Sequence, residues 1–180
     1  MEQNQQMRST TIICVAKNNK VTMISDGQVT LGDMIVKSDA KKVRSICDGK
    51  FVVGFAGSVV DALTLVERLE AKLKEFSYNL ERGCIELARD WRTEKYLKTL
   101  QAQILIANKE RIFSISGNGD ILEVDCGVAS VGSGSKFALS AGLALYDLKG
   151  QTSETIAEKA MDIAGKFCIY SNNNNTKITL

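Results

Sequence analysis

The chain has 180 residues, 44% of them hydrophobic and 24% charged, and its 23 Lys and Arg against 21 Asp and Glu leave a net charge of +2. This length and composition fit one globular domain with its own buried core, and the near-neutral charge argues against a dedicated nucleic-acid-binding protein. The absence of histidine excludes Ser-His-Asp and Cys-His catalysis and an HExxH zinc site within this chain.

The first nine residues, MEQNQQMRS, are polar and precede an abrupt start of strand-like sequence at Thr10. β-Branched residues then concentrate in two runs, 10–16 and 21–25. The polar step Asn18-Asn19 lies between the runs, and this pattern predicts a β-hairpin.

A second pair of strands is predicted at 43–47 and 51–56, joined through Asp48-Gly49, which is a strong hairpin signal. The run 51–56 is continuously apolar, which indicates a strand covered on both faces. Apolar residues then recur every three to four positions, which predicts an amphipathic helix at 59–76 and a second helix at 79–100.

The second half of the chain predicts the same order again, with strands followed by two helices. Strand-like segments lie at 103–107, 111–116, 121–124 and 128–131. Helical spacing returns at 136–148 and 152–167, and short terminal strands are predicted at 168–170 and 176–180. Because strands and helices are segregated, this order favours an α+β fold of two sheets between helix pairs over a doubly wound parallel sheet.

Five cysteines, at 14, 47, 84, 126 and 168, form no CxxC pair and lie in apolar sequence. They predict buried thiols in a reducing compartment. No apolar stretch approaches the ~18 residues that span a bilayer, and the first ten residues lack the apolar core of a signal peptide. We therefore expect a cytoplasmic protein that does not bind membranes.

Two adjacent lysines are candidates for a catalytic role, because a chain without histidine needs an amine or a carboxylate to activate a nucleophile. Lys41 and Lys42 open a predicted strand, where alternation directs one of the two inward. An inward lysine needs a buried acidic partner, and Asp26 ends the second predicted strand. The spacing alone favours the alternative, in which both lysines are solvated on an edge strand.

The start of the first strand offers a second candidate. Cleavage between Ser9 and Thr10 would leave Thr10 as a terminal residue with a hydroxyl nucleophile and a free α-amine. The ordinary pKa of an α-amine, about 7.7–8.0, suits a general base at neutral pH. The commoner explanation of such a leader is an unstructured tail before a strand.

The glycine-rich segment GSGSK at 132–136 has neither the residue order of a phosphate-binding loop nor that of a nucleophile elbow. It predicts a tight turn into a helix, whose free N–H groups can donate to a partner.

Eight segments match a known family, in order, over essentially all of the chain after residue 9. They are TTI at 10–12, SDGQVTLG at 25–32, KKVR at 41–44, GFAGS at 54–58, DA at 61–62, ELARDWRT at 86–93, SGNGD at 116–120 and GSG at 132–134. Together they resemble the HslV family of proteasome-like threonine peptidases. The resemblance implies an N-terminal-nucleophile hydrolase with a four-layer αββα sandwich, a propeptide at 1–9 removed by self-cleavage, and a single peptidase domain at 10–180.

The resemblance also implies roles for five residues. Thr10 would attack the scissile carbonyl through its hydroxyl, and its own amine would accept the proton. Lys42 would hold positive charge beside this nucleophile, and Asp26 would orient Lys42. Ser133 would complete the hydrogen-bond network around the amine, and the N–H of Gly54 would stabilise the tetrahedral oxyanion.

A monovalent cation, sodium, is further implied, bound by the carbonyls of Gly165, Cys168 and Ser171. The alternative is a plain helix end whose carbonyls bind water. No nucleotide is expected on this chain. The implied partners are a hexameric ATPase of the HslU type, further copies of this chain in two stacked hexameric rings, and unfolded polypeptide substrates, with no nucleic acid.

The sequence departs from the family pattern in its longer leader, in Ser25 and Ser135 where glycine is usual, and in the asparagine run at 172–175. None of these changes removes a catalytic group. A bacterial cytoplasm is expected, with a mitochondrion as the alternative for a protist source. Two other functions remain open, a catalytically silent ring scaffold and a small-molecule amidase on the same fold.

Overall fold

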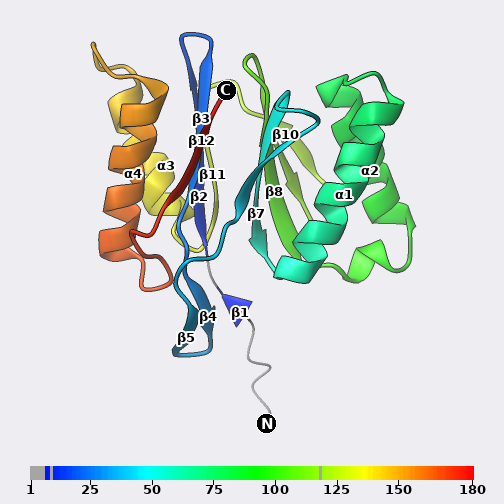
Figure 1. The fold of residues 1–180 in the computed structure, drawn as a ribbon, viewed down its shortest axis with the longest axis horizontal. Helices are drawn as coiled ribbons and strands as arrows, with labels where there is room; N and C mark the ends of the chain where they lie inside the picture. Colours follow the sequence, from blue (N-terminus) through cyan, green and yellow to red (C-terminus); the bar gives the residue numbers. More distant parts are fainter. Residues whose placement is uncertain (1–6, 9, 118) are drawn as a thin grey trace.

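The computed structural model describes residues 7–8, 10–117 and 119–180. Its main body consists of four layers, in which a helix pair, two facing β-sheets and a second helix pair follow one another (Figure 1). The predicted α+β class and the αββα sandwich are confirmed. Within the described residues, no helix is long and apolar enough to cross a membrane.

The first sheet has four antiparallel strands and is covered by the second half of the chain. Its strands, in spatial order, are β11 (Val128–Gly132), β2 (Thr11–Lys17), β3 (Lys20–Ser25) and β12 (Thr176–Thr179). Two helices cover its outer face, α3 (Ser135–Tyr146) and α4 (Ser153–Phe167). Asn18 and Asn19 both have positive φ, as the tight turn of the predicted hairpin requires.

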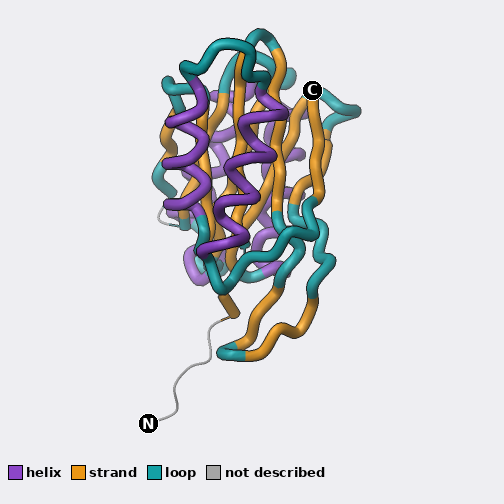
Figure 2. The backbone as a smooth tube through the Cα atoms, turned by 90° about the vertical axis from the view of Figure 1, so that its left-hand side faces the viewer, coloured by secondary structure: helices purple, strands orange, loops and turns teal. Residues whose placement is uncertain are grey.

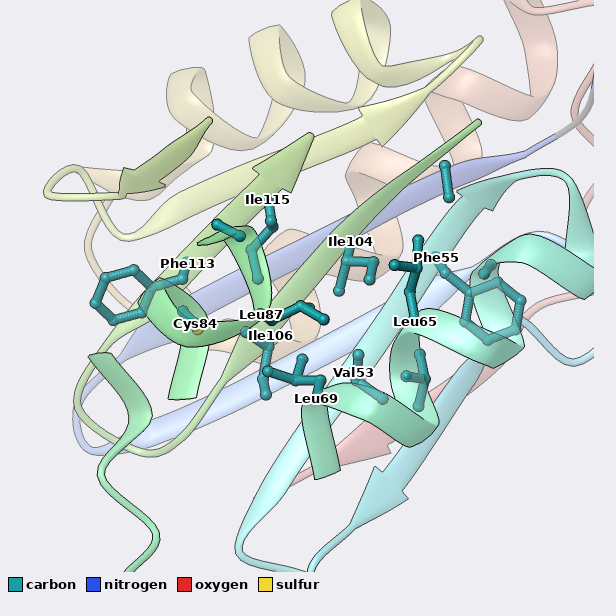
Figure 3. Packing of buried hydrophobic residues seen from close by; sticks show 14 of the residues in the cluster. Val53, Phe55, Leu65, Leu69, Cys84, Leu87, Ile104, Ile106, Phe113 and Ile115 are labelled. Atoms are coloured by element: carbon teal, nitrogen blue, oxygen red, sulfur yellow. The ribbon is translucent and has the colours of Figure 1, made fainter. Parts of the chain in front are cut away.

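The second sheet has five antiparallel strands. In spatial order they are β10 (Ile121–Glu123), β9 (Ile112–Ser116), β8 (Ala102–Ala107), β7 (Phe51–Gly57) and β6 (Val43–Ile46). Helices α1 (Val59–Glu75) and α2 (Leu80–Thr93) cover its outer face. Buried side chains of both helices and the sheet interlock there, including Leu65 and Leu69 from α1 and Leu87 from α2 (Figure 3).

The inner strands are buried on both faces, which explains their continuous apolar sequence. In β2, Ile12 and Cys14 point into the core between the two sheets, whereas Ile13 and Val15 point toward α3 and α4. Successive side chains of a strand point to opposite faces. Four layers therefore enclose three apolar cores, and β2 contributes to two of them.

A third, small sheet lies outside the sandwich and was not predicted. It pairs β1 (Met7–Arg8), β4 (Val29–Leu31) and β5 (Met34–Lys37) in that order. The β4–β5 hairpin projects beyond the main body (Figures 1 and 2). All four residues of β5 are exposed, so the burial pattern that reveals a strand in a sequence is absent there.

Three expectations are corrected. The second helix ends at Thr93 and not at 100, because Glu94 is extended and the Thr93 hydroxyl donates to the carbonyl of Arg89. The chain from Cys168 makes a turn, with the Ser171 N–H donating to the Cys168 carbonyl, and not a strand. Cys126 is exposed, whereas the other four thiols are buried.

Candidate active site

The candidate residues meet where β2 begins and β3 ends, beside the turn that leads into α3. Thr10 and Thr11 open β2, and Asp26 follows β3 directly. The Thr11 N–H donates to Asp26 Oδ1 (2.8 Å), and the Asp26 N–H donates back to the Thr11 carbonyl (3.1 Å). Both side chains are buried, so residues 15 positions apart in the sequence form the floor of one site.

Lys42 is the inward member of the lysine pair, and Lys41 is exposed. The Lys42 ammonium lies 3.2 Å from Asp26 Oδ1, and the side chains are 3% and 0% exposed. It also donates to the Gln28 carbonyl (2.5 Å). The second carboxylate oxygen, Asp26 Oδ2, accepts the Gln28 N–H (2.9 Å). The buried pair expected of an inward lysine is therefore present, and the edge-strand alternative does not hold.

Burial lowers the pKa of Lys42 below the ordinary 10.5, and the negative charge of Asp26 partly offsets this shift. An ammonium with a lowered pKa loses its proton at a lower pH than an ordinary lysine does. We expect the rate of peptide hydrolysis to fall as the pH rises, and the midpoint of this fall to lie below pH 10.5. A pH–rate profile tests this, with circular dichroism to confirm that the chain is still folded. Full activity up to the pH of unfolding would contradict it.

Thr10 itself is buried and adopts an unusual backbone conformation. Its side chain is 2% exposed, and its φ of 120° lies in a region that L-residues rarely occupy. The Ser133 hydroxyl donates to the Thr10 carbonyl (3.2 Å). Gly132 has a φ of 96°, and a Cβ there would overlap the Thr10 carbonyl oxygen. The glycine turn thus packs directly on Thr10, and the Ser133 hydroxyl contacts the Thr10 carbonyl. Its predicted role in the network around the amine stays a prediction.

Gly54 occupies a position that does not suit the oxyanion donor expected of it. The N–H of the next residue, Phe55, donates to the Lys42 carbonyl. Since neighbouring residues of a strand direct their N–H groups to opposite edges, the Gly54 N–H faces β8, where Gly54 pairs with Leu105. A Cβ on Gly54 would meet Ile12 and side chains between the sheets, so no substrate reaches this backbone.

Gly57, at the end of β7, is better placed for that role. It is exposed, and its N–H faces the same edge as that of Phe55, beyond the last paired residue of β6. Among the described residues, β6 pairs with no residue of β7 beyond Gly54, so no strand of this sheet lies opposite that N–H. A Cβ built on Gly132 would meet both the Thr10 carbonyl and, at 3.4 Å, Ala56, so the residue preceding Gly57 lies next to Thr10. We assign the oxyanion donor to Gly57.

The two glycines predict different mutational effects. Gly57 has a φ of 107°, and a Cβ there would overlap the Gln101 carbonyl, so Gly57→Ala should turn the N–H away and lower kcat by roughly 10²-fold. Gly54→Ala crowds Met23 and Ile12 and should cost about 1–3 kcal/mol of stability while keeping kcat per folded subunit. Steady-state kinetics with thermal unfolding separate the two. The reverse pattern would assign the donor to Gly54.

Three polar side chains of the site make contacts that the sequence did not reveal. The Gln28 side chain donates to the Ile169 carbonyl (2.9 Å), and the Thr11 and Ser171 hydroxyls lie 2.5 Å apart. These contacts join the start of β2 and the segment after β3 to the loop after α4. Thr11 and Gln28 lie within matching motifs, and Ser171 was expected to act through its carbonyl. Their side-chain partners lie more than 100 residues away in the sequence.

The three expected cation ligands lie together at the end of α4. The Cys168 carbonyl accepts the Ser171 N–H (3.1 Å), and among the described residues no N–H donates to the carbonyls of Gly165 or Ser171. Carbonyl oxygens at a helix end suit a hard monovalent cation. No cluster of acidic or cysteine side chains that could hold a metal occurs in the part of the chain that is described, so any ion here would rely on carbonyl oxygens.

The geometry supports chemistry by a terminal threonine. In the described chain Thr10 is still preceded by other residues, so its nitrogen is a peptide nitrogen without basic character. Cleavage of the peptide bond before Thr10 would leave a free amine and a hydroxyl on this one residue. Both would lie beside the Asp26–Lys42 pair and near the Gly57 N–H. A nucleophile, a base, a fixed positive charge and an oxyanion donor would then share one site.

Known proteins resemble this chain over nearly its whole length. Residues 7–179 match the family model described as proteasome subunit. The ATP-dependent protease subunit HslV of Treponema denticola is 49% identical over 94% of this chain and 95% of its own. The ATP-dependent protease subunit HslV of Wolbachia sp. subsp. Brugia malayi is 49% identical over 93% of this chain and 96% of its own.

Solved structures give the same picture. The crystal structure of eukaryotic HslV from Trypanosoma brucei superposes with a TM-score of 0.91 at 41% identity, covering 94% of this chain and 98% of that one. Thiobacillus denitrificans BPH has a TM-score of 0.74 at 20% identity, over 94% of this chain and 97% of that one, which is a likeness of fold alone. The similarity thus spans the sandwich and every residue of the candidate site.

Proposed function

The chain belongs to the proteasome subunit family, within its HslV group, and on that premise we propose that it is the threonine-type endopeptidase of a two-component ATP-dependent protease that degrades unfolded proteins. One observation supports this most strongly, the buried Asp26–Lys42 ion pair hydrogen-bonded to the residue after Thr10. A buried charge pair is costly to retain for structure alone. A silent scaffold has no need of it, and no observation favours that alternative.

In the proposed reaction, the Thr10 hydroxyl attacks the scissile carbonyl and its proton passes to the Thr10 α-amine. The Lys42 ammonium keeps this amine neutral, because a nearby positive charge lowers the pKa of an amine. The Gly57 N–H stabilises the oxyanion of the tetrahedral intermediate, and the amine then protonates the leaving group. Water hydrolyses the resulting ester, which returns Thr10 to its starting state.

We place the working domain at 10–180, after self-cleavage of the leader 1–9. Ser9, on one side of the scissile bond, lies outside the described residues. The leader residues Met7 and Arg8 pair with Leu31 and Thr30 of β4 in an antiparallel ladder. An unfolded substrate would add a strand to the same edge, which gives affinity through main-chain hydrogen bonds with little regard to side chains. Such recognition suits a protease of many unfolded substrates.

The remaining components follow from the family. We propose that a hexameric ATPase of the HslU type unfolds substrates, that this chain assembles in two stacked hexameric rings, and that it works in a reducing, cytoplasmic compartment. We also propose sodium as the cation held by the Gly165, Cys168 and Ser171 carbonyls. That ion would fix the loop after α4, whose Ser171 hydroxyl contacts Thr11.

The function is tested with the purified chain, an HslU-type ATPase and a permanently unfolded model protein. We expect degradation that needs both the ATPase and ATP hydrolysis. Rings that assemble with the ATPase, carry a free Thr10 and still leave the substrate intact would indicate a scaffold subunit. Turnover only of small amides, by a species that is not a stacked ring, would indicate an amidase.

A further inference from the structure

The asparagine run that interrupts the family pattern contains a structured residue. Asn172 Oδ1 accepts the Gly27 N–H (3.1 Å) and the Asn174 N–H (3.1 Å), and Asn172 Nδ2 donates to the Ser38 carbonyl (3.0 Å). Its own N–H donates to Asp26 Oδ2 (3.4 Å). A single residue therefore contacts the catalytic carboxylate, the residue after it, and the segment that leads to Lys42.

The orientation of this carboxamide is fixed by its partners. A backbone N–H only donates and a backbone carbonyl only accepts, so Oδ1 must face Gly27 and Nδ2 must face Ser38. Asn172 is half-buried, and its loop between α4 and β12 lies beside the base of the β4–β5 hairpin (Figure 1). An oxygen that accepts two N–H groups and a nitrogen bonded to a carbonyl leave this side chain little freedom.

Close packing joins the two segments that Asn172 bridges. A Cβ on Gly27 would lie 2.5 Å from the Ser38 carbonyl oxygen and 2.9 Å from that of Asn174. The Ala40 N–H donates to the Gly27 carbonyl (2.9 Å), and the Asn174 side chain donates to the Ser38 carbonyl (3.0 Å). The chain at 38–40 is thereby held against Gly27, although residues 38 and 39 are exposed and have few other contacts to fix them.

The bridged segments carry the two charged groups of the site. Asp26 adjoins Gly27, and Lys42 follows Ala40 by two residues. Their separation, 3.2 Å between Lys42 Nζ and Asp26 Oδ1, depends on how segments 26–28 and 38–42 lie against each other. An error of about 1 Å in the position of a catalytic group can lower a rate by 10²-fold.

We propose that Asn172 is a positioning residue of this enzyme. By bridging the Gly27 N–H and the Ser38 carbonyl, it fixes the position of Asp26 relative to Lys42. The proposal rests on the proposed function for its kinetic consequence only. The bridge itself is a statement about hydrogen bonds, which can be measured without any activity.

Asn172→Ala tests the bridge, with Asn175→Ala as the matched control, because the exposed Asn175 side chain makes no hydrogen bond among the described residues. In hydrogen–deuterium exchange of the processed assembly, we expect faster exchange at Gly27 and Ala40 in Asn172→Ala alone. In peptide hydrolysis by the holoenzyme, we expect kcat per processed subunit to fall ~10- to 100-fold. KM should stay within about twofold of the parent value, because strand β4, whose edge would bind the substrate, is unchanged. Exchange at Gly27 and Ala40 equal to the control would overturn the bridge, and an unchanged kcat would overturn the positioning role.

Asn174→Ala is a second variant, for use where Asn172→Ala assembles poorly. It removes one donor to the Ser38 carbonyl and leaves all side-chain bonds of Asn172. We expect a smaller rise in exchange, confined to 38–40, and a smaller fall in kcat. Exchange at 38–40 equal to that of Asn175→Ala would contradict a bridge at the Ser38 carbonyl. Failure of the proposed function would show differently, as hydrolysis that does not depend on Thr10 while the exchange result stands.

Discussion

Replacing Thr10 with alanine is expected to lower peptide hydrolysis by roughly 10³-fold or more, because removal of the nucleophile ends covalent catalysis. The same change should leave the leader 1–9 attached, since self-cleavage uses the same hydroxyl. The Thr10 side chain is buried but makes no hydrogen bond to another described side chain. The variant should therefore fold and assemble, and the loss should lie in chemistry and not in stability.

Thr10→Ser is the control for this prediction, because serine keeps the hydroxyl and the position of the amine. It should retain the leader cleavage and a measurable part of the activity. The assays are peptide hydrolysis and intact mass, run side by side on both variants. If Thr10→Ala hydrolysed the peptide as fast as the parent chain, Thr10 would not be the nucleophile.

Replacing Lys42 with methionine is expected to abolish activity and also to destabilise the fold. The change keeps the length of the side chain but leaves Asp26 as a buried carboxylate without its charged partner. Loss of one member of a buried ion pair typically costs about 3–5 kcal/mol. The remaining N–H donors to Asp26, from Thr11, Gln28 and Asn172, should keep the loss of stability near the lower end of this range.

Lys41→Met is the matched control, because Lys41 is adjacent in sequence and exposed. Chemical denaturation should show a stability near that of the parent chain, and peptide hydrolysis should be retained. If the two methionine variants lose equal stability and equal activity, the buried pair has no special role and Lys42 is only part of a basic segment.

The layer order of the fold was predictable because it depends on local patterns. Periodicity identified the four helices, β-branched residues identified the strand at 10–16, and the continuous apolar run at 51–56 identified a strand that lies between two cores. Strand β5 was missed for the same reason, since its four exposed residues carry no such pattern. The helix α2 ends at Thr93 because Glu94 is extended, which the apolar spacing does not encode.

The site was predictable only in part. Spacing alone favoured a solvated Lys42, which is wrong, because the Lys42 side chain is buried and paired with Asp26. The motif GFAGS contains two glycines, and only the alternation of N–H groups along β7 shows that Gly57, and not Gly54, faces the site. Asn172 was indistinguishable from its neighbours, because its partners Gly27 and Ser38 lie more than 130 residues away in the chain.

The account depends above all on Thr10 becoming the first residue of the working subunit. Intact mass spectrometry of the wild-type assembly, purified with its ATPase and active in ATP-dependent degradation, tests this directly. The predicted result is one dominant species that lacks residues 1–9 and begins at Thr10. An active assembly in which every subunit retains MEQNQQMRS would contradict the account, because no free amine would then stand beside the hydroxyl.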